Sequence, residues 1–226
     1  DITIGESGGV KALLEQFPVK VKELSEKEKQ QLFQDIIHNK TEKVKALLDS
    51  GMDVNVNLSS TESMLMKASK WGNAEMIKLL LSYSPDINYR DKYGNNALTQ
   101  ALNNYDHYRQ IVPFLLKAGA DPNSKVGSSG KINSTALGKM TRQALVSKNE
   151  EDYQIIEMFL SRGAEPNQAP KSGTTPLMQA AYKGNVKFVK LFLKYGADPG
   201  LKDKQGKTAL DMAKKKNYQQ VIDLLQ

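Results

Sequence analysis

A short pattern recurs five times along the chain and constrains its fold more than any other feature. Two apolar and two variable residues precede a glycine, and an acidic residue and an asparagine usually follow it, as in the run LLKAGADPN that ends at Asn123. The glycine place falls at positions 51, 84, 119, 163 and 196, with Ser84 in the second copy, so successive copies are 33, 35, 44 and 33 residues apart. A unit of this length cannot bury its own apolar face, so we expect the units to stack on one another and build a shared core.

A second pattern lies upstream of each glycine and predicts a pair of short helices in every unit. Its clearest copy is the run GTTPLMQAAYKGN at 173–185. Thr175 is placed to cap a first helix that begins at Pro176, where a missing N–H costs nothing, and the Ala-Ala pair lets that helix press closely on its neighbours. Apolar residues within 186–193 then recur with a helical period. Gly196 is expected to close this second helix in the left-handed conformation that glycine favours.

The two patterns, found in register, are similar to the ankyrin repeat, a family whose 33-residue unit carries a T-P-L-H-x-A signature; here the clearest run reads TPLMQA. The resemblance covers about residues 25–226. It implies an all-α solenoid of stacked helix-turn-helix units joined by short β-hairpin turns, with about six repeats including a cap at each end. We place the units at about residues 25–55, 56–88, 89–123, 124–167, 168–199 and 200–226.

Two of these units depart from the common form. In the first, Ser25 precedes Glu28 in the arrangement of a capping box, so we expect a polar cap helix at about 27–38. The fourth has four extra residues before the place of its signature threonine and seven after it. We expect a flexible loop at 124–131 and a longer segment at 139–152, both directed outward. Neutral drift and partner recognition both stand as reasons for these insertions.

Residues 1–24 do not fit the repeat and form an amino-terminal extension. Residues 10–17 predict a short helix, which Pro18 should end. The extension is either an extra element packed over the first repeat or a linker toward an upstream region. Because the chain begins at Asp1 and shows no signal-like apolar stretch, we expect a processed or trimmed form that has lost any targeting segment.

Composition and charge exclude several classes of protein. Without cysteine the chain has no disulfide, thiolate metal site or thiol nucleophile, and two histidines cannot alone furnish a three-ligand zinc site. No apolar run approaches the ~18 residues of a membrane-spanning helix. The net charge of +7 is concentrated in residues 168–226, which carry eleven lysines against four aspartates. This surplus attracts acidic surfaces or phosphates, or serves solubility alone.

Two glycine-rich runs imitate a phosphate-binding loop without meeting its requirements. The run GKT at 206–208 lacks the glycine that the motif needs at position 201, which is Leu201, and the repeat already explains it as a turn and a helix cap. The run GSSGK at 127–131 is followed by Ile132 where serine or threonine is required. We expect a flexible loop there.

The remaining candidates for catalysis are also weak. His38 and His107 lie in different repeats, at the predicted ends of their first helices, and are expected to be surface residues without a metal. The acidic run at 150–152 is expected to be solvated at the start of a second helix, where negative charge favours the helix dipole. We therefore expect no enzyme activity.

The resemblance also implies a binding surface, a concave groove built from hairpin tips and first helices. Its variable positions are the two before the turn glycine, the one after it, and the two after the alanine pair. In the second and third units they hold Ser59, Ser60, Glu62, Lys70, Trp71, Lys92, Tyr93, Asn95, Asn103 and Asn104. In the fifth and sixth they hold Lys171, Ser172, Thr174, Tyr182, Lys183, Lys204, Gln205, Lys207, Lys215 and Lys216. We carry no position over to the distorted fourth unit.

These positions predict a groove with two zones. Trp71, the only tryptophan, is expected to act with Tyr93 and Tyr182 as an apolar anchor, since aromatic residues are typical hot spots. In the alternative, Trp71 folds over a neighbouring repeat. Lysines at the carboxy-terminal end are expected to steer and pair acidic residues of a partner. These are Lys171, Lys183, Lys204, Lys207, Lys215 and Lys216.

The sequence thus predicts a monomeric, non-catalytic scaffold that binds another protein, with an acidic patch on that partner, and needs no cofactor. A receptor for a phosphate-bearing ligand such as a single-stranded oligonucleotide is an alternative, although only four arginines speak for nucleic acid. An inhibitory or adaptor module of a larger or exported bacterial protein is another, which the lysine- and asparagine-rich composition would suit. Cytoplasmic and exported locations are equally compatible with the sequence.

Overall fold

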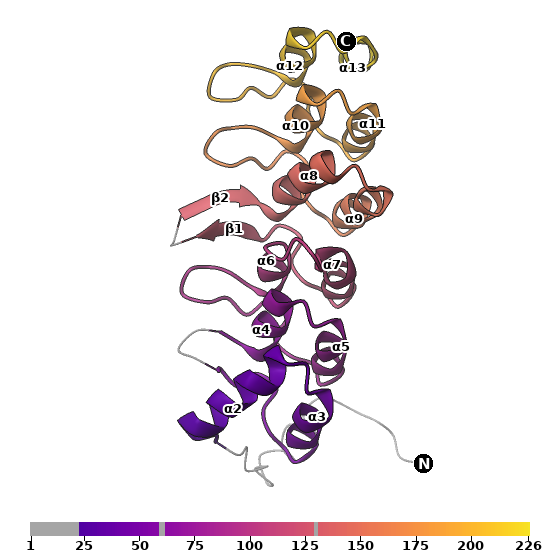
Figure 1. Ribbon diagram of the computed structural model, residues 1–226. Coiled ribbons are helices and arrows are strands. Elements are labelled where there is room, and N and C mark those ends of the chain that lie inside the picture. Colours follow the sequence, from indigo (N-terminus) through magenta and orange to yellow (C-terminus); the bar gives the residue numbers. More distant parts are fainter. Residues whose placement is uncertain (1–22, 59–61, 129–130) are drawn as a thin grey trace, which may run out of the picture.

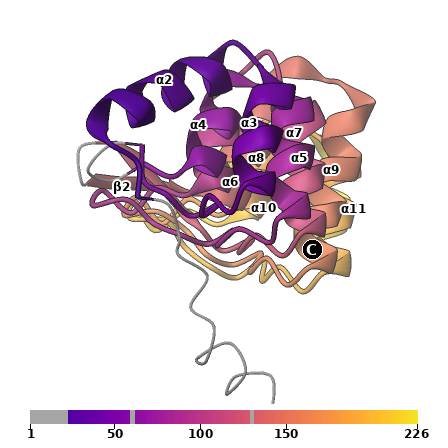
Figure 2. The same ribbon diagram turned by 90° about the horizontal axis from the view of Figure 1, so that it is seen from below.

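The chain folds into a stack of helix pairs, as the repeat predicts. The computed structural model describes residues 23–58, 62–128 and 131–226, so the helix expected at 10–17 lies outside the described residues. Figure 1 shows two parallel columns of helices with hairpin loops projecting from one side, and Figure 2 gives the view along the stack. We number the units by their helix pairs, from α2–α3 to α12–α13, within this part of the chain.

The first helices form one column and the second helices the other. The first helices are α2 (Glu26–Ile37), α4 (Met64–Trp71), α6 (Ala97–Ala101), α8 (Ala136–Ser147), α10 (Pro176–Tyr182) and α12 (Ala209–Lys215). The second helices are α3 (Thr41–Asp49), α5 (Ala74–Ser82), α7 (Tyr108–Lys117), α9 (Glu150–Ser161), α11 (Val186–Lys194) and α13 (Gln219–Leu225). This arrangement confirms the all-α solenoid.

Side chains cap every first helix at its amino-terminal end. The capping residues are Ser25, Ser63, Asn96, Thr135, Thr175 and Thr208, and each accepts a hydrogen bond from a backbone N–H of the first turn. Such a cap is worth about 1 kcal/mol. The capping box of Ser25 and Glu28 and the placement of Pro176 at the first position of α10 are both as predicted.

The turn after each second helix requires a left-handed residue. Gly196 follows α11 with φ +81°, as predicted from the repeat. Ser84, which stands in the same place after α5, is also held in this region, with φ +53°. Serine pays a steric cost there that glycine avoids, so the second copy of the pattern keeps the turn without its preferred residue.

The core lies between the two columns and runs continuously through the stack. The alanine pair of α10 is fully buried, which allows α10 to pack on both α8 and α12. Phe159 of α9 and Phe192 of α11 are fully buried on the side of the second helices. Each unit therefore contributes one face to a core that its neighbours complete.

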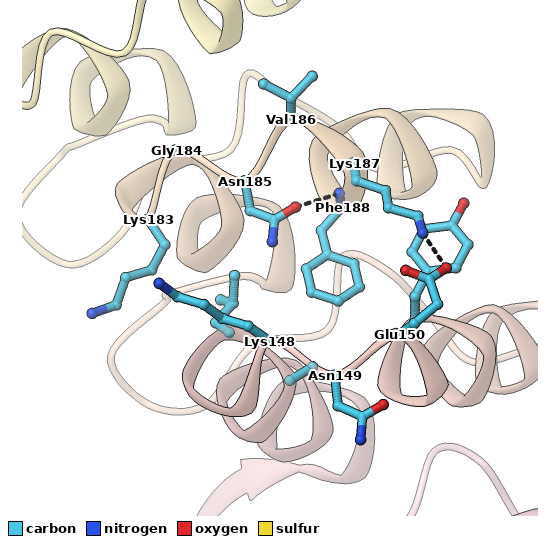
Figure 3. A pocket seen from close by; sticks show the side chains of 12 residues that line it. Lys148, Asn149, Glu150, Lys183, Gly184, Asn185, Val186, Lys187 and Phe188 are labelled. Carbon is cyan, nitrogen blue, oxygen red and sulfur yellow. Dashed lines mark hydrogen bonds and ion pairs between the residues drawn. The ribbon is translucent and has the colours of Figure 1, made fainter.

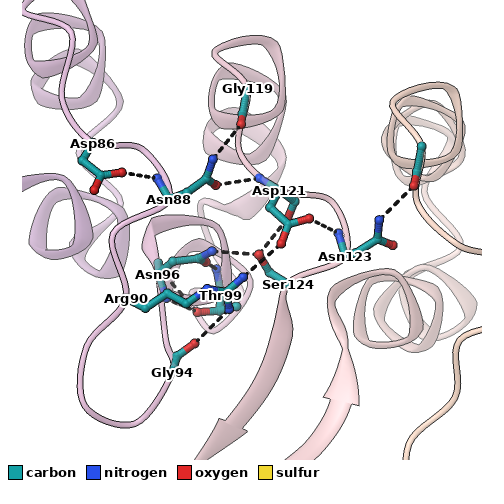
Figure 4. A network of polar contacts seen from close by, with 11 residues as sticks. Asp86, Asn88, Arg90, Gly94, Asn96, Thr99, Gly119, Asp121, Asn123 and Ser124 are labelled. Carbon is teal, nitrogen blue, oxygen red and sulfur yellow. Dashed lines mark hydrogen bonds and ion pairs between the residues drawn. The ribbon is translucent and has the colours of Figure 1, made fainter.

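The asparagine of the repeated pattern, which the fifth copy replaces by Gly200, ties a unit to the next (Figure 4). Asn88 donates from Nδ2 to the carbonyl of Gly119 at 3.2 Å, and its Oδ1 accepts from the backbone N–H of Asp121 at 2.8 Å. Asn123 and Asn167 repeat both bonds in the following units. The spacing of the motif thus has a mechanical reason: one side chain satisfies two backbone groups of its neighbour.

The fourth unit corrects one prediction. The expected flexible loop at 124–131 is wrong, because β1 (Lys125–Ser128) pairs antiparallel with β2 (Lys131–Thr135), with an irregular register between Val126 and Gly127. Val126 is buried, which anchors the hairpin to the body of the unit. The residues inserted after the hairpin lengthen helices: α8 and α9 have 12 residues each, whereas α10 has 7 and α11 has 9.

Candidate partner-binding surface

The three aromatic residues predicted as anchors are all exposed to solvent. Trp71 ends α4 with 51% of its surface exposed, Tyr93 lies in the hairpin before α6 with 49%, and Tyr182 ends α10 with 42%. Trp71 is therefore not buried between repeats. Ser59 and Ser60 lie outside the described residues.

Predicted lysines lie over two of these rings, those of Tyr93 and Tyr182. Lys92 lies over the ring of Tyr93 at 5.1 Å, and Lys183 and Lys216 lie over that of Tyr182 at 5.9 Å and 5.1 Å. The six lysines expected to meet an acidic partner form no ion pair with any described residue. Their charge is thus available to a ligand.

Several other predicted groove residues hold the fold instead. Asn104 donates from Nδ2 to the backbone carbonyl of Lys70 at 3.0 Å and so links the third unit to the end of α4. Asn95 donates from Nδ2 to Asp91 at 3.0 Å within its own hairpin. Glu62 forms an ion pair with the buried Lys67.

The remaining predicted positions lie on the hairpins and at helix ends. Asn103 accepts a hydrogen bond from Lys139, and Ser172 accepts at its carbonyl from the N–H of Lys204, which stacks the fifth and sixth hairpins. Gln205 lies on the exposed tip of the sixth hairpin.

Two neighbouring hollows open on either side of α8. One, of about 380 Å³, lies between the third and fourth units; the other, of about 330 Å³, lies between the fourth, fifth and sixth. Arg142 and Val146 of α8 line both. The first is completed by Tyr105, Tyr108, Arg109, Gln143 and Ser147. The second is completed by Leu145, Thr174, Met178, Gln179, Tyr182, Lys183 and Met212.

Sequence reasoning found Thr174, Tyr182 and Lys183 of this surface and missed the residues of the fourth unit. Arg142 and Val146 are exposed and lie four residues apart on one face of α8, whereas the three residues between them are buried. The available signal for Arg142 was its register, since it follows the capping Thr135 by seven residues, as Tyr182 follows Thr175. Val146 lies beyond the level at which α10 ends, so no aligned position marked it.

The cations of this surface are partly stripped of water. Desolvation lowers the pKa of Arg142 below its usual value. Desolvation also lowers the pKa of Lys139, and the positive charge of Arg142 lowers it further. Lys139 lies over the ring of Tyr105 at 5.7 Å. Arg142 has no ion pair or hydrogen bond within the described ranges, so this charge lacks compensation.

A buried ion pair fixes the wall between the third and fourth units. Asp152 is fully buried and accepts from Arg109 through Nε–Oδ1 and Nη2–Oδ2, both at 2.9 Å. The hydroxyl of Tyr108 donates to Oδ1 at 2.8 Å, and that of Ser147 donates to Oδ2. Burial, and then the bond to Asp152, raises the pKa of Tyr108 to about 12. The bond to Asp152 also raises the pKa of Arg109.

This cluster corrects the prediction for the acidic run. Glu150 and Glu151 are exposed in the first turn of α9, as expected. Asp152 is not solvated, because its partners come from α7 and α8 rather than from its own helix. It is a structural anion.

A third pocket, of about 630 Å³, opens at the helix turns between the fourth and fifth units (Figure 3). The end of α8 and the start of α9 form one wall, and the α10–α11 turn forms the other. Tyr153 stacks on Phe188 with ring centroids 5.8 Å apart, and Lys187 lies 4.0 Å over Tyr153 while pairing with Glu150. The pocket follows from the greater length of α8 and α9.

The motifs set aside on sequence grounds have structural roles. Thr208 of the run at 206–208 caps α12, as expected. His38 bonds through Nδ1 with the carbonyl of Gln34 at the end of α2, whereas His107 begins α7 rather than ending a first helix. Among the described residues there is no group of three or more side chains able to hold a metal ion.

The fold and its surface define a repeat solenoid of the kind that recognises partners with exposed side chains. A family model for three copies of the ankyrin repeat matches residues 32–126 and 144–226. The chain belongs to the ankyrin repeat family.

Solved and curated proteins agree with this assignment. An ankyrin repeat domain from Acinetobacter baumannii is 25% identical with a TM-score of 0.71, over 86% of this chain and 95% of that one. A chain in the complex of a predatory endopeptidase from Bdellovibrio bacteriovorus with an immunity protein is 29% identical with a TM-score of 0.65, over 86% and 95%. The mitochondrial disaggregase of Bos taurus is 30% identical over 145 residues, which are 53% of this chain and 21% of that protein.

The chain spans about a fifth to just over a third of the first curated relatives that it matches, 21% to 36% of their length. Over the part of the chain that the structure describes, every helix is too short or too polar to cross a membrane.

Proposed function

We propose that this chain binds a partner protein through the exposed side chains of its first helices and hairpins, and that it does so without catalysis. The observation that carries the proposal is the exposure of Trp71, Tyr93 and Tyr182, which with Tyr105, Val146 and Tyr218 are the exposed large apolar side chains of the described residues. Exposed aromatic side chains on a rigid scaffold are typical anchors of protein interfaces.

The charge around the anchors indicates an acidic partner. Lysines without ion pairs lie over Tyr93 and Tyr182, and residues 168–226 carry eleven lysines against four aspartates. Such a field raises the rate of encounter with an acidic surface and suppresses basic partners. The similarity to a chain from a complex between an endopeptidase and an immunity protein supports a partner that is itself a protein.

A capture experiment from lysate of the source organism tests this proposal. The baits are the wild-type chain, a Trp71→Ala/Tyr182→Ala variant, and a Lys117→Ala/Lys190→Ala control whose changes lie on exposed positions of second helices. Circular dichroism confirms that all three are folded. We expect one protein to be retained by the wild type and the control, to resist nuclease, and to be lost with the aromatic variant.

Other outcomes would redirect the assignment. Equal retention by all three baits would contradict the proposal. Retention that nuclease abolishes, with a steep fall of affinity as salt rises, would instead indicate the phosphate-bearing ligand. If the captured protein is an enzyme whose activity falls on binding, the inhibitory role follows, which the similarity to the immunity-protein complex also favours.

A further inference from the structure

The fourth unit exposes an apolar side chain beside an unpaired cation. Val146 is 77% exposed, more than any other large apolar side chain of the described residues. Arg142 lies one turn before it on α8, so both project from the same face of the helix. Arg142 follows the capping Thr135 by seven residues, in the same register as Tyr182 after Thr175 and Lys215 after Thr208. Val146 lies beyond the level at which those helices end.

These two residues form the ridge between two hollows. On one side the wall is apolar: Leu145, Met178 and Met212 come from three successive first helices, and Tyr182 closes the rim. Methionine side chains adapt their shape to an apolar ligand. On the other side lie Tyr105 and Gln143. Each hollow is at the lower end of the ~300–1,000 Å³ range of ligand pockets, enough for a side chain rather than a cofactor.

The charge of this surface has one sign. No aspartate or glutamate lines either hollow. Arg109 is neutralised by Asp152, which leaves Arg142 and Lys183 as the cations without an acidic partner among the described residues. Arg142 is exposed and lines both hollows, so a carboxylate can reach it and accept charge-assisted hydrogen bonds. The complement of this surface is acidic.

Two orphan acceptors distinguish a peptide from a phosphate. The Oε1 atoms of Gln143 and Gln179 are buried and have no hydrogen-bond partner among the described residues, and each glutamine lines one hollow. Gln143 is only 8% exposed, and its Nε2 already donates to the carbonyl of Leu102 at 3.0 Å. A buried acceptor needs a donor. Peptide backbone supplies N–H groups, whereas a phosphate supplies none.

We infer that the two hollows form one groove for an acidic segment of the partner protein, with a carboxylate on Arg142, a large apolar side chain against Val146 in the hollow of Leu145, and backbone N–H groups toward the glutamines. This inference rests on the proposed function and adds the chemistry of the bound segment. The third unit's tyrosines and the fifth unit's Tyr182 border the same groove.

A random peptide library displayed on phage is the probe that tests this inference. It is selected in parallel on the wild-type chain, on Arg142→Glu, and on Lys190→Glu, a control that makes the same charge change on the exposed side of α11. We expect wild type and control to enrich peptides in which an acidic residue neighbours a large apolar one. On Arg142→Glu, fluorescence anisotropy of the selected peptides should show binding weaker by about tenfold or more.

Exchanging the charges of Arg142 and of the peptide's acidic residue shows whether the two side chains are in direct contact or whether the variant has changed structure. A selected peptide in which the acidic residue is replaced by lysine should bind Arg142→Glu more tightly than it binds the wild type. Val146→Asp should weaken the original peptide as strongly as Arg142→Glu does. Urea unfolding curves of the variants verify that each is folded.

The inference fails if the enriched peptides lack acidic residues, bind Arg142→Glu as tightly as the wild type, or do not appear at all. Peptides that lose binding with Trp71→Ala but not with Arg142→Glu would leave the proposed function standing and overturn this groove. The lysate capture with the Trp71→Ala/Tyr182→Ala variant decides the proposed function independently.

Discussion

Removal of Arg109 is expected to weaken the junction between the third and fourth units far more than an ordinary surface ion pair would suggest. Asp152 is completely buried, and Arg109 provides the only cation that contacts it among the described residues, through two bonds of 2.9 Å. Arg109→Ala leaves that carboxylate with two hydroxyl donors, Tyr108 and Ser147. Breaking a buried pair by removing one partner costs about 3–5 kcal/mol. Because the hydroxyls remain, we expect the lower end, about 3 kcal/mol.

The matched control is Lys194→Ala, which removes an exposed ion pair with Glu157. Its atoms are 3.1 Å apart, and the two side chains are 65% and 37% exposed. Exposed pairs of this kind contribute about 0–1 kcal/mol, since water and salt screen them. The two variants thus remove the same type of contact at similar distances and differ in burial.

Urea unfolding followed by two signals measures the effect. Trp71 fluorescence reports the second unit, since it is the only tryptophan, and far-ultraviolet circular dichroism reports the whole stack. Each repeat contacts only its neighbours, so a weakened junction uncouples the two halves. We expect the two curves to coincide in the wild type and to separate in Arg109→Ala. The reasoning is refuted if Arg109→Ala loses no more stability than Lys194→Ala and its two curves still coincide.

Two further outcomes follow from single side chains. The pKa of Tyr108 is about 12 in the folded chain and about 10 in the unfolded chain, so the protonated phenol stabilises the fold. This contribution is complete below pH ~10 and is lost as the pH rises toward ~12. The stability difference between wild type and Tyr108→Phe should therefore shrink by roughly 2–3 kcal/mol between pH ~9 and pH ~12, measured by urea midpoints; a constant difference would contradict it. Asn88→Ala, which removes the bonds to Gly119 and Asp121, should cost about 1–2 kcal/mol in urea unfolding, and an unchanged midpoint would contradict the linking role of this asparagine.

Local patterns predicted the fold because the interactions that define it are local. Ser25 with Glu28, and Thr175 with Pro176, settle where helices begin within three residues of chain. The glycine place settles where second helices end, and even Ser84 adopts the required left-handed conformation. Stacking then follows from apolar faces that have no other partner.

The features that the sequence did not predict depend on distant partners. Asp152 reads as a solvated residue of a helix start, because Arg109 lies 43 positions away. The hairpin of β1 and β2 depends on the register between two short strands. The glycines and serines at 127–130 are typical of a loop, so the sequence did not indicate this pairing. Arg142 was not predicted because no groove position was carried over to the distorted fourth unit, although it follows its capping threonine by seven residues, as Tyr182 and Lys215 follow theirs.

The lengthening of α8 connects these missed features. Val146 is the eleventh residue of a helix whose counterparts α4, α10 and α12 end by the eighth, so no first helix lies beside it at that level. Ser147, the next residue and the last of α8, donates to Asp152, which Arg109 holds from the third unit. The extension is thereby fixed at its tip rather than free to fray. Rigid presentation lowers the entropy lost on binding, so the buried pair supports the exposed ridge that we propose as the binding groove.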